Sequence, residues 1–351
     1  MVNERIVQLA AWVAKALSTI HGTPVHTRNI KIATLAGDAS FRRYFRVTLT
    51  TKLRFATYVL VDAPPPESLE PFVSIALAYS EAGVRVPKVL ASNPELGAML
   101  QEDFGDQLFF SAAEQSANAY ALYQAAIQGL PAIMQVKEHR QGSLPPYDRA
   151  LLERENSLFR DWLLSTHLQL SLTPTEERVW QSFSEALIQN ALLQPQVGVH
   201  RDYHSRNLMV LGDSAEALGV IDFQDAVVGP ITYDVVSLLR DCYRVLPAEQ
   251  LHALRSSAYE LCLHEQLLPA SSSAEEWQRW FDLMGLQRHT KAAGIFARLY
   301  HRDDKAGYLA DIPTTVAYLQ NVASQYPEFA EYQQLLTDKV LPAIAAQNLE
   351  S

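Results

Sequence analysis

The chain has 351 residues, of which 48% are hydrophobic and 19% charged, a balance that is typical of folded globular proteins and excludes a wholly disordered chain. Its length suffices for one large domain or two ordinary ones. The 29 Lys and Arg residues face 39 Asp and Glu residues, which gives a formal net charge of −10. This acidity argues against nucleic acid as the main ligand, although a local basic patch could still bind a small phosphate compound.

The first third of the chain is predicted to be a β-rich lobe with one helix on either side of its first three strands. Apolar residues at helical spacing predict the first helix at 5–20, and a second helix at 71–82 would be closed by Gly83. Runs of β-forming residues predict strands at 30–35, 42–49, 55–61, 86–91 and 97–101. The glycine-containing loop at 36–40 would join the first two strands, and three prolines at 64–66 would end the third.

From Asp106 onward the pattern changes to long helical stretches. These are predicted at 114–135, 148–168, 174–193, 230–266, 275–300 and 314–346. One interruption reads as a β-hairpin, with strands at 208–211 and 218–221 around a turn-rich segment. We therefore predict an α+β fold with a small β-rich lobe at 1–105 and a larger helical lobe at 106–351.

The sequence offers no signal for export or for a membrane span. Charged residues interrupt its first residues, and the longest uncharged stretch, 115–136, contains amide side chains that would be unfavourable in hydrocarbon. The two cysteines, Cys242 and Cys262, cannot form a disulfide scaffold and are interpreted as buried thiols in a reducing compartment. We therefore expect a cytoplasmic protein without a membrane partner.

The strongest chemical signal is the segment His-Arg-Asp-Tyr-His-Ser-Arg-Asn at 200–207, followed by Ile-Asp-Phe at 221–223. Asp202 and Asn207 lie five residues apart in a segment that ends at a strand, and the hairpin would return Asp222 to the side of Asn207. One carboxylate would then be available for proton transfer. The other carboxylate and the amide oxygen suit a hard cation such as Mg²⁺, which prefers oxygen ligands and shares them with phosphates. This set of groups favours phosphoryl transfer.

These motifs resemble the protein-kinase-like superfamily, and the branch they are most similar to is the aminoglycoside phosphotransferase and choline kinase group. A closer resemblance, to the bacterial anomeric kinases of N-acetylmuramate and N-acetylglucosamine in cell-wall recycling, covers nearly the whole chain. It is carried by the segments 37–45, 61–65 and 200–207, and by Arg288-His289, Lys291 and Gly294-Ile295-Phe296. The resemblance implies a bilobal protein-kinase-like fold, in which the lobe at 1–105 would bind the nucleotide and the lobe at 106–351 would carry the catalytic loop and the acceptor site. It also implies ATP and Mg²⁺ as cofactors, a sugar as acceptor, and a monomer.

The resemblance also implies a role for individual residues. Asp202 would be the catalytic base, and Asn207 and Asp222 would hold magnesium. Asp234 would brace the loop and the start of a helix. The nucleotide would be contacted by the loop over its phosphates and by a hinge whose backbone pairs with adenine, a set that comprises Gly37, Asp38, Ala39, Ser40, Phe41, Arg42, Arg43, Glu102 and Phe104.

The sequence departs from the kinase pattern in the small lobe. Kinases place a lysine on the third strand, but here that strand reads Tyr-Val-Leu-Val-Asp at 58–62. Arg42, Arg43 and Arg46 are the nearest cations, with Arg42 and Arg46 on one face of a strand and Arg43 on the other. Either face could supply the positive charge that phosphates need.

Several alternatives remain open at this point. Glu155, Gln224 and Asp225 could contact the acceptor or could have structural roles, and the alternation of His200, Asp202 and His204 could indicate a zinc site. A kinase of an aminoglycoside, a choline-like compound or another small alcohol would share the same motifs. A catalytically silent nucleotide-binding protein would explain the missing lysine, but it would not need Asp202.

Overall fold

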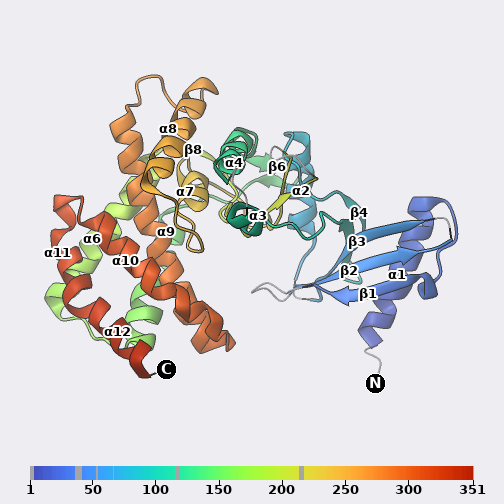
Figure 1. Ribbon diagram of the computed structural model, residues 1–351, viewed down its shortest axis with the longest axis horizontal. Coiled ribbons are helices and arrows are strands. Elements are labelled where there is room, and N and C mark those ends of the chain that lie inside the picture. The colour runs from blue at the N-terminus through green and yellow to red at the C-terminus, as the bar shows by residue number, and fades with distance from the viewer. Residues whose placement is uncertain are drawn as a thin grey trace.

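The computed structural model describes residues 4–35, 42–52, 54–65, 67–115, 119–212 and 217–350. They form a β-rich lobe and a larger helical lobe, which lie at opposite ends of the long axis in Figure 1. The α+β bilobal prediction is therefore confirmed. Among the described residues, no helix is both long and apolar enough to span a bilayer.

A five-stranded antiparallel sheet forms the centre of the small lobe, in the order β1-β2-β3-β5-β4. Its strands are β1 (Ile30–Thr34), β2 (Arg43–Thr50), β3 (Phe55–Asp62), β4 (Val89–Asn93) and β5 (Ala98–Glu102). Four of them lie close to the predicted ranges. β4 begins at Val89 instead of residue 86, and Pro87 lies just ahead of it, where it has no N–H to donate to a strand ladder.

The two faces of the sheet pack against different helices. Alternation along β3 directs Tyr58 and Leu60 toward α1 (Glu4–His21), whereas Val59 and Val61 pack in the core that contains the apolar residues of α2 (Glu70–Glu81). The core beneath α1 is separate from the larger core that continues into the helical lobe. The central strand β3 is therefore buried on both faces of the sheet.

The helical lobe is built around α9, the long orange helix in Figure 1. Its helices are α3 (Phe109–Gln115), α4 (Ala119–Met134), α5 (Arg149–Leu158), α6 (Pro174–Leu193), α7 (Tyr233–Leu239), α8 (Ala248–His264), α9 (Ala274–Asp303), α10 (Ile312–Ala323), α11 (Ala330–Leu335) and α12 (Leu341–Glu350). π-helical turns continue α5 over Phe159–His167 and α11 over Leu336–Val340. Short 3₁₀ turns lie at Thr27–Asn29, Ala306–Asp311 and Pro327–Phe329.

Two of the long helical predictions are wrong in their continuity. The stretch 230–266 is divided into α7 and α8, because Arg240 leaves the helical conformation and Pro247 starts the second helix as its N-cap. The stretch 314–346 is likewise interrupted after α10, where Pro327 begins a short 3₁₀ turn. Both interruptions precede a proline that cannot continue the hydrogen bonding of a preceding helix.

Four strands of two to four residues are not predicted from the sequence. They are β6 (Glu138–His139), β7 (Gly142–Ser143), β8 (Gln196–Val199) and β11 (Val227–Pro230), and they pair β6 with β7 and β8 with β11. The predicted hairpin is present as β9 (Leu208–Val210) and β10 (Leu218–Val220). Cys262 is buried and Cys242 half-buried, and both are free thiols.

Candidate active site

Two small sheets hold the loop at 200–207. The loop leaves β8 and enters β9, and the return strand β10 is followed by the turn that leads to β11. The turn is joined to the loop by backbone hydrogen bonding, since the N–H of Ile221 donates to the carbonyl of Asn207 at 3.1 Å. The predicted hairpin therefore brings residues 207 and 222 together in space.

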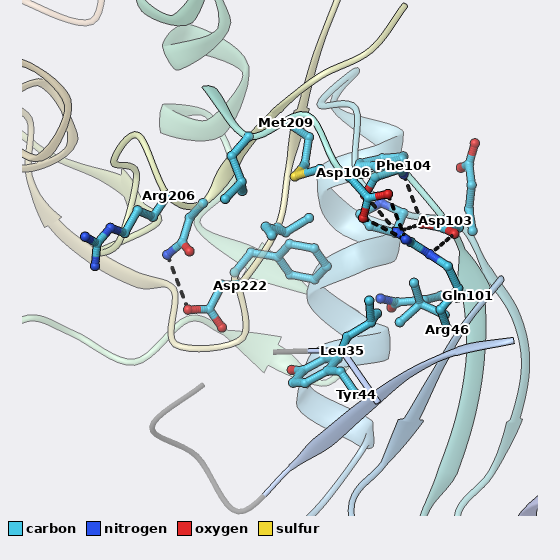
Figure 2. Close-up of a pocket in the computed structure, with 18 of the residues that line it drawn as sticks. Leu35, Tyr44, Arg46, Gln101, Asp103, Phe104, Asp106, Arg206, Met209 and Asp222 are labelled. Atoms are coloured by element: carbon cyan, nitrogen blue, oxygen red, sulfur yellow. Dashed lines mark hydrogen bonds and ion pairs between the residues drawn. The ribbon is translucent and has the colours of Figure 1, made fainter. Parts of the chain in front are cut away.

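Asp202, Asn207 and Asp222 meet at this junction. Nδ2 of Asn207 lies 3.0 Å from the carbonyl oxygen of Asp202 and 3.3 Å from Oδ2 of Asp222. Figure 2 shows Asp222 at the edge of the cleft, on the side that faces Arg206. Asp222 has a φ of 64°, in the left-handed region that non-glycine residues rarely adopt. Such strained backbone is found preferentially at functional sites.

Buried side chains brace the loop from behind. The carboxylate of Asp234 accepts the backbone N–H groups of His200 and Arg201 at 2.7 and 3.0 Å, which matches the bracing expected for it. His200 is fully buried with Nε2 at 3.0 Å from the carbonyl of Ile221, and burial lowers its pKa to about 4. Asp241, for which the sequence analysis predicts no role, accepts both the N–H and the hydroxyl of Ser205.

The environment of Asp202 is cationic. Burial opposes ionisation of its carboxyl, but nearby positive charges outweigh that effect and lower its pKa to about 2. The groups responsible, in decreasing order, are Lys291, His204, Arg201 and Arg288. The carboxyl is consequently ionised at neutral pH, as a proton acceptor must be.

Glu155 lies behind this loop in a buried ionic network. Its carboxylate is 2.5 Å from the guanidinium of Arg201 and 3.2 Å from Nζ of Lys291, and it also accepts the hydroxyl of Tyr147. Burial would raise the pKa of Glu155, but the charges of Lys291 and Arg201 lower it below its usual range. The structure therefore places Glu155 against two cations and not among the residues that line the cleft described next.

A cleft of 540 Å³ lies between the lobes, beside the linker at 103–108 that joins β5 to α3. It is lined from the small lobe and the linker by Leu35, Tyr44, Arg46, Val59, Phe72, Pro87, Gln101, Glu102, Asp103, Phe104, Gly105, Asp106 and Leu108, and from the helical lobe by Arg206, Asn207, Met209, Ile221, Asp222 and Phe223. Figure 2 shows Gln101 directed into this space. Its Oε1 atom is buried without a hydrogen-bond partner, a signal that appears only once the sheet is formed.

The three arginines near the start of β2 have different partners. Arg46 faces the cleft and binds Asp103 and Asp106 of the linker, each at 2.7 Å (Figure 2). Arg42 lies 3.2 Å from Glu67. Arg43 points to the opposite side of the sheet, where it shares the buried carboxylate of Asp62 with Arg5 of α1, so neither Arg42 nor Arg43 lines the cleft.

The remaining predicted residues are distributed unevenly. The segment 37–41, with Gly37, Asp38, Ala39, Ser40 and Phe41, lies outside the described residues. Glu102 and Phe104 line the cleft, although the carboxylate of Glu102 binds Arg85 and its N–H donates to the carbonyl of Lys88. Gln224 donates to Oδ1 of Asp222 at 2.7 Å, and Asp225 is exposed and does not line the cleft.

The donor set at the junction fits a hard cation better than zinc. Asp222 supplies carboxylate oxygens, and the Nδ2 contacts of Asn207 leave its Oδ1 as a further acceptor. Both are oxygen ligands of the kind that Mg²⁺ takes together with phosphates. Within the part of the chain that the structure describes, no three His, Cys, Asp or Glu side chains are grouped to hold a metal. Both ring nitrogens of His200 have backbone partners, Nε2 the carbonyl of Ile221 and Nδ1 the N–H of Asp202, which leaves neither of them free for the zinc alternative.

The chain is similar to known proteins both in sequence and in fold. Residues 31–266 match the phosphotransferase enzyme family. Over 302 residues, 86% of each chain, the sequence is 41% identical to the N-acetylmuramate/N-acetylglucosamine kinase of Pseudomonas aeruginosa. Among solved structures, the fold is similar to an ethanolamine kinase of Plasmodium vivax, with a TM-score of 0.60, 11% identity, and coverage of 87% of this chain and 85% of that one. It is also similar to APH(2")-IIa in its ternary complex with streptomycin and ATP. The TM-score is 0.53, the identity is 15%, and the match covers 90% of this chain and 97% of that one.

Proposed function

The chain belongs to the phosphotransferase enzyme family, and from that premise we propose that it transfers the γ-phosphoryl group of ATP to the anomeric hydroxyl of N-acetylmuramate and N-acetylglucosamine. The Pseudomonas aeruginosa relative supports these acceptors, because it is a kinase of both sugars and 41% identical to this chain. A second relative, from Pseudomonas putida, has the same name and is 37% identical over 337 residues.

The nucleotide is proposed to bind in the cleft between the lobes. Its volume of 540 Å³ is within the usual range for a small-molecule site. The ATP complex of the similarly folded APH(2")-IIa supports nucleotide binding by this fold. Most nucleotide contacts would come from the lobe at 1–105, and the acceptor would lie against the lobe at 106–351.

Magnesium is proposed to be held by Asn207 and Asp222. When bound there, the ion would neutralise charge on the phosphates and orient them. Gln224 would position Asp222 through its 2.7 Å hydrogen bond to Oδ1. The strained φ of Asp222 supports this role, because it directs a charged side chain to the cleft at a conformational cost of about 1–3 kcal/mol.

Asp202 is proposed as the group that orients and deprotonates the acceptor hydroxyl, and the observation that carries this proposal is its place beside Asn207 and close to the cations Lys291, Arg201 and Arg288. Because its pKa is about 2, Asp202 is a weak base, and it suits an acidic hydroxyl. An anomeric hydroxyl is more acidic than an ordinary alcohol. Most of the catalytic effect would then come from positioning and charge neutralisation.

The cations around Asp202 also bear on the alternative acceptors. An enzyme that phosphorylates a cationic aminoglycoside or a choline-like alcohol would benefit from carboxylates around its acceptor. Here Lys291, Arg201 and Arg288 act on Asp202, while Glu155 is engaged by two of them. This charge distribution favours a neutral or anionic sugar.

The test is to incubate the protein with Mg-ATP and a panel of N-acetylmuramate, N-acetylglucosamine, choline and aminoglycosides, and to measure ADP release. The products are then assayed for a reducing end, which anomeric phosphorylation abolishes and phosphorylation of the primary hydroxyl preserves. We expect ADP release with both N-acetylated sugars and loss of reducing power. A reducing product would overturn the anomeric assignment, and turnover of only choline or an aminoglycoside would overturn the acceptor class.

A further inference from the structure

One guanidinium beside the candidate active site has no carboxylate partner among the described residues. Arg288 lies on α9 with its guanidinium carbon 5.1 Å from the centre of the Tyr233 ring. Its Nε atom is buried and makes no hydrogen bond. Burying this N–H without a hydrogen-bond acceptor is unfavourable, so the position is suited to an anion that arrives with a ligand.

Two neighbouring cations, Arg201 and Lys291, differ from Arg288 because each is already paired with a carboxylate. Arg201 lies 2.5 Å and Lys291 3.2 Å from the same carboxylate of Glu155. Lys291 also donates to the hydroxyl of Tyr233 at 3.1 Å. These contacts fix the two side chains within the protein. Of these three cations, Arg288 is the one that makes no ion pair with a carboxylate of the described residues.

Arg288 belongs to the cluster of side chains next to Asp202. Its guanidinium lies over the Tyr233 ring, whose hydroxyl accepts from Lys291 at 3.1 Å, and both Lys291 and Arg288 act on the charge of Asp202, the carboxylate proposed to receive the acceptor hydroxyl. It does not line the 540 Å³ cleft proposed for the nucleotide, whose helical-lobe wall includes Arg206, Asn207 and Asp222. An anion that Arg288 binds would on this geometry belong to the acceptor.

We propose that Arg288 binds the carboxylate of an anionic acceptor and so makes N-acetylmuramate a better substrate than N-acetylglucosamine. The inference rests on the proposed function, and it names the residue that would distinguish the two sugars. They differ by the lactyl ether of N-acetylmuramate, which ends in a carboxylate. A guanidinium matches a carboxylate with two parallel N–H donors, which an ammonium group cannot reproduce.

The test compares kcat/KM for the two sugars in the wild type, Arg288→Met and Arg288→Lys. We expect Arg288→Met to lower the ratio of kcat/KM for N-acetylmuramate over N-acetylglucosamine by about 10- to 100-fold, the range typical for a lost charge-assisted hydrogen bond. Arg288→Lys should lower it less. Arg279→Met is the matched control, since Arg279 lies on the same helix and pairs with Glu328 on the surface; it should leave the ratio unchanged.

A change in the substrate gives a second, independent measurement. The methyl ester of N-acetylmuramate removes the negative charge and keeps the lactyl group. The wild type should prefer the acid to the ester, whereas Arg288→Met should treat the two alike, and the difference between these preferences measures the coupling directly. This comparison remains valid if Arg288→Met loses stability, because acid and ester are measured on the same protein, and Arg288→Lys can replace it if it does not fold.

The outcomes separate the possible errors. If both sugars lose activity equally and the KM for ATP rises, Arg288 binds a phosphate of the nucleotide, and the proposal is wrong. If the ratio and the acid–ester preference are unchanged in both variants, Arg288 contacts neither anion, and the proposal is equally wrong. If the wild type phosphorylates neither sugar, the proposed function itself fails before any variant is compared.

Discussion

Arg42, Arg43 and Arg46 occupy neighbouring positions at the start of one strand, and strand alternation gives each a different partner. Arg43 points away from the cleft to the buried Asp62, and Arg46 binds the linker carboxylates Asp103 and Asp106. The sequence predicted correctly that Arg43 and Arg46 point to opposite faces, because alternation is a local property, whereas Arg42 lies just outside β2. It could not predict their partners, which lie between 19 and 60 residues away in the chain.

The first prediction concerns Asp202. Asp202→Asn keeps the shape of the side chain and removes its capacity to accept a proton, so kcat should fall by about 10²–10⁴-fold while Mg-ATP still binds. Steady-state kinetics measures kcat, and calorimetric titration measures the affinity for Mg-ATP. The exposed Asp338→Asn is the matched control and should retain full activity. A variant with more than about a tenth of the wild-type kcat would show that Asp202 is not the base.

The second prediction concerns the proposed metal ligands. Asp222→Asn removes one negative charge from the pair with Asn207, so the magnesium concentration needed for half-maximal activity should rise and ATP should bind more weakly. Asn207→Ala should act in the same direction but less strongly, because it removes a neutral ligand. Activity is measured against magnesium concentration at fixed ATP. An unchanged magnesium dependence in both variants would remove these residues from the metal site.

At the scale of elements, one glycine allows the hairpin β9–β10 to pack closely against the linker that borders the cleft. A Cβ atom at Gly219 would lie 2.4 Å from the ring of Phe104, and the guanidinium of Arg85 also packs on this ring, 4.6 Å from its centre. The hairpin and the linker can approach this closely only because position 219 has no side chain. The sequence predicted the hairpin, but not that it would contact the linker.

The third prediction follows from this contact. Gly219→Ala should displace the Phe104 ring, raise the KM for ATP several-fold and destabilise the protein by about 1–3 kcal/mol, as overpacking usually does. Thermal unfolding and ATP kinetics measure the two effects. Adding Phe104→Leu should restore part of both losses, and Gly307→Ala, where a Cβ meets nothing within 4 Å, is the control. If Phe104→Leu restores nothing, the contact does not determine the geometry of the cleft.

At the scale of the whole molecule, Arg46 connects the sheet to the linker between the lobes. Its guanidinium binds Asp103, whose side chain is 3% exposed, and also Asp106 and the carbonyl of Gly105 at 3.0 Å. The linker is therefore attached to β2 as well as to β5, from which it continues. The domain boundary at residue 105 stays a prediction, and these contacts show how residues on both sides of it are connected.

The fourth prediction tests that connection. Arg46→Met should lower the free energy of unfolding by about 1–3 kcal/mol, because it leaves the buried carboxylate of Asp103 without its partner, and it should raise the KM for ATP. Chemical denaturation and ATP kinetics provide the measurements. Arg140→Met is the control, because Arg140 pairs with Glu81 on the surface, where such pairs contribute about 0–1 kcal/mol. Equal effects of the two substitutions would mean that the linker is not held by Arg46.

The fold and the junction at 202, 207 and 222 could be predicted because they depend on short-range patterns. Strand alternation, the spacing of the hairpin and the five-residue separation of Asp202 and Asn207 are all visible in the sequence. The cationic surroundings of Asp202 could not be derived in this way, because Lys291 and Arg288 come from α9, more than 80 residues later. The sequence leaves Glu155 between an acceptor contact and a structural role, since its two cationic partners become neighbours only in the folded chain.

The central strand of the small lobe has a further consequence. Tyr58 and Leu60 of β3 belong to the core beneath α1, and Val59 and Val61 belong to the core that continues into the helical lobe. Neither core can open fully without exposing one side of this strand. Amide hydrogens along β3 should therefore exchange with solvent only through the rarest openings of the lobe, whereas edge strand β1 can exchange while both cores remain intact.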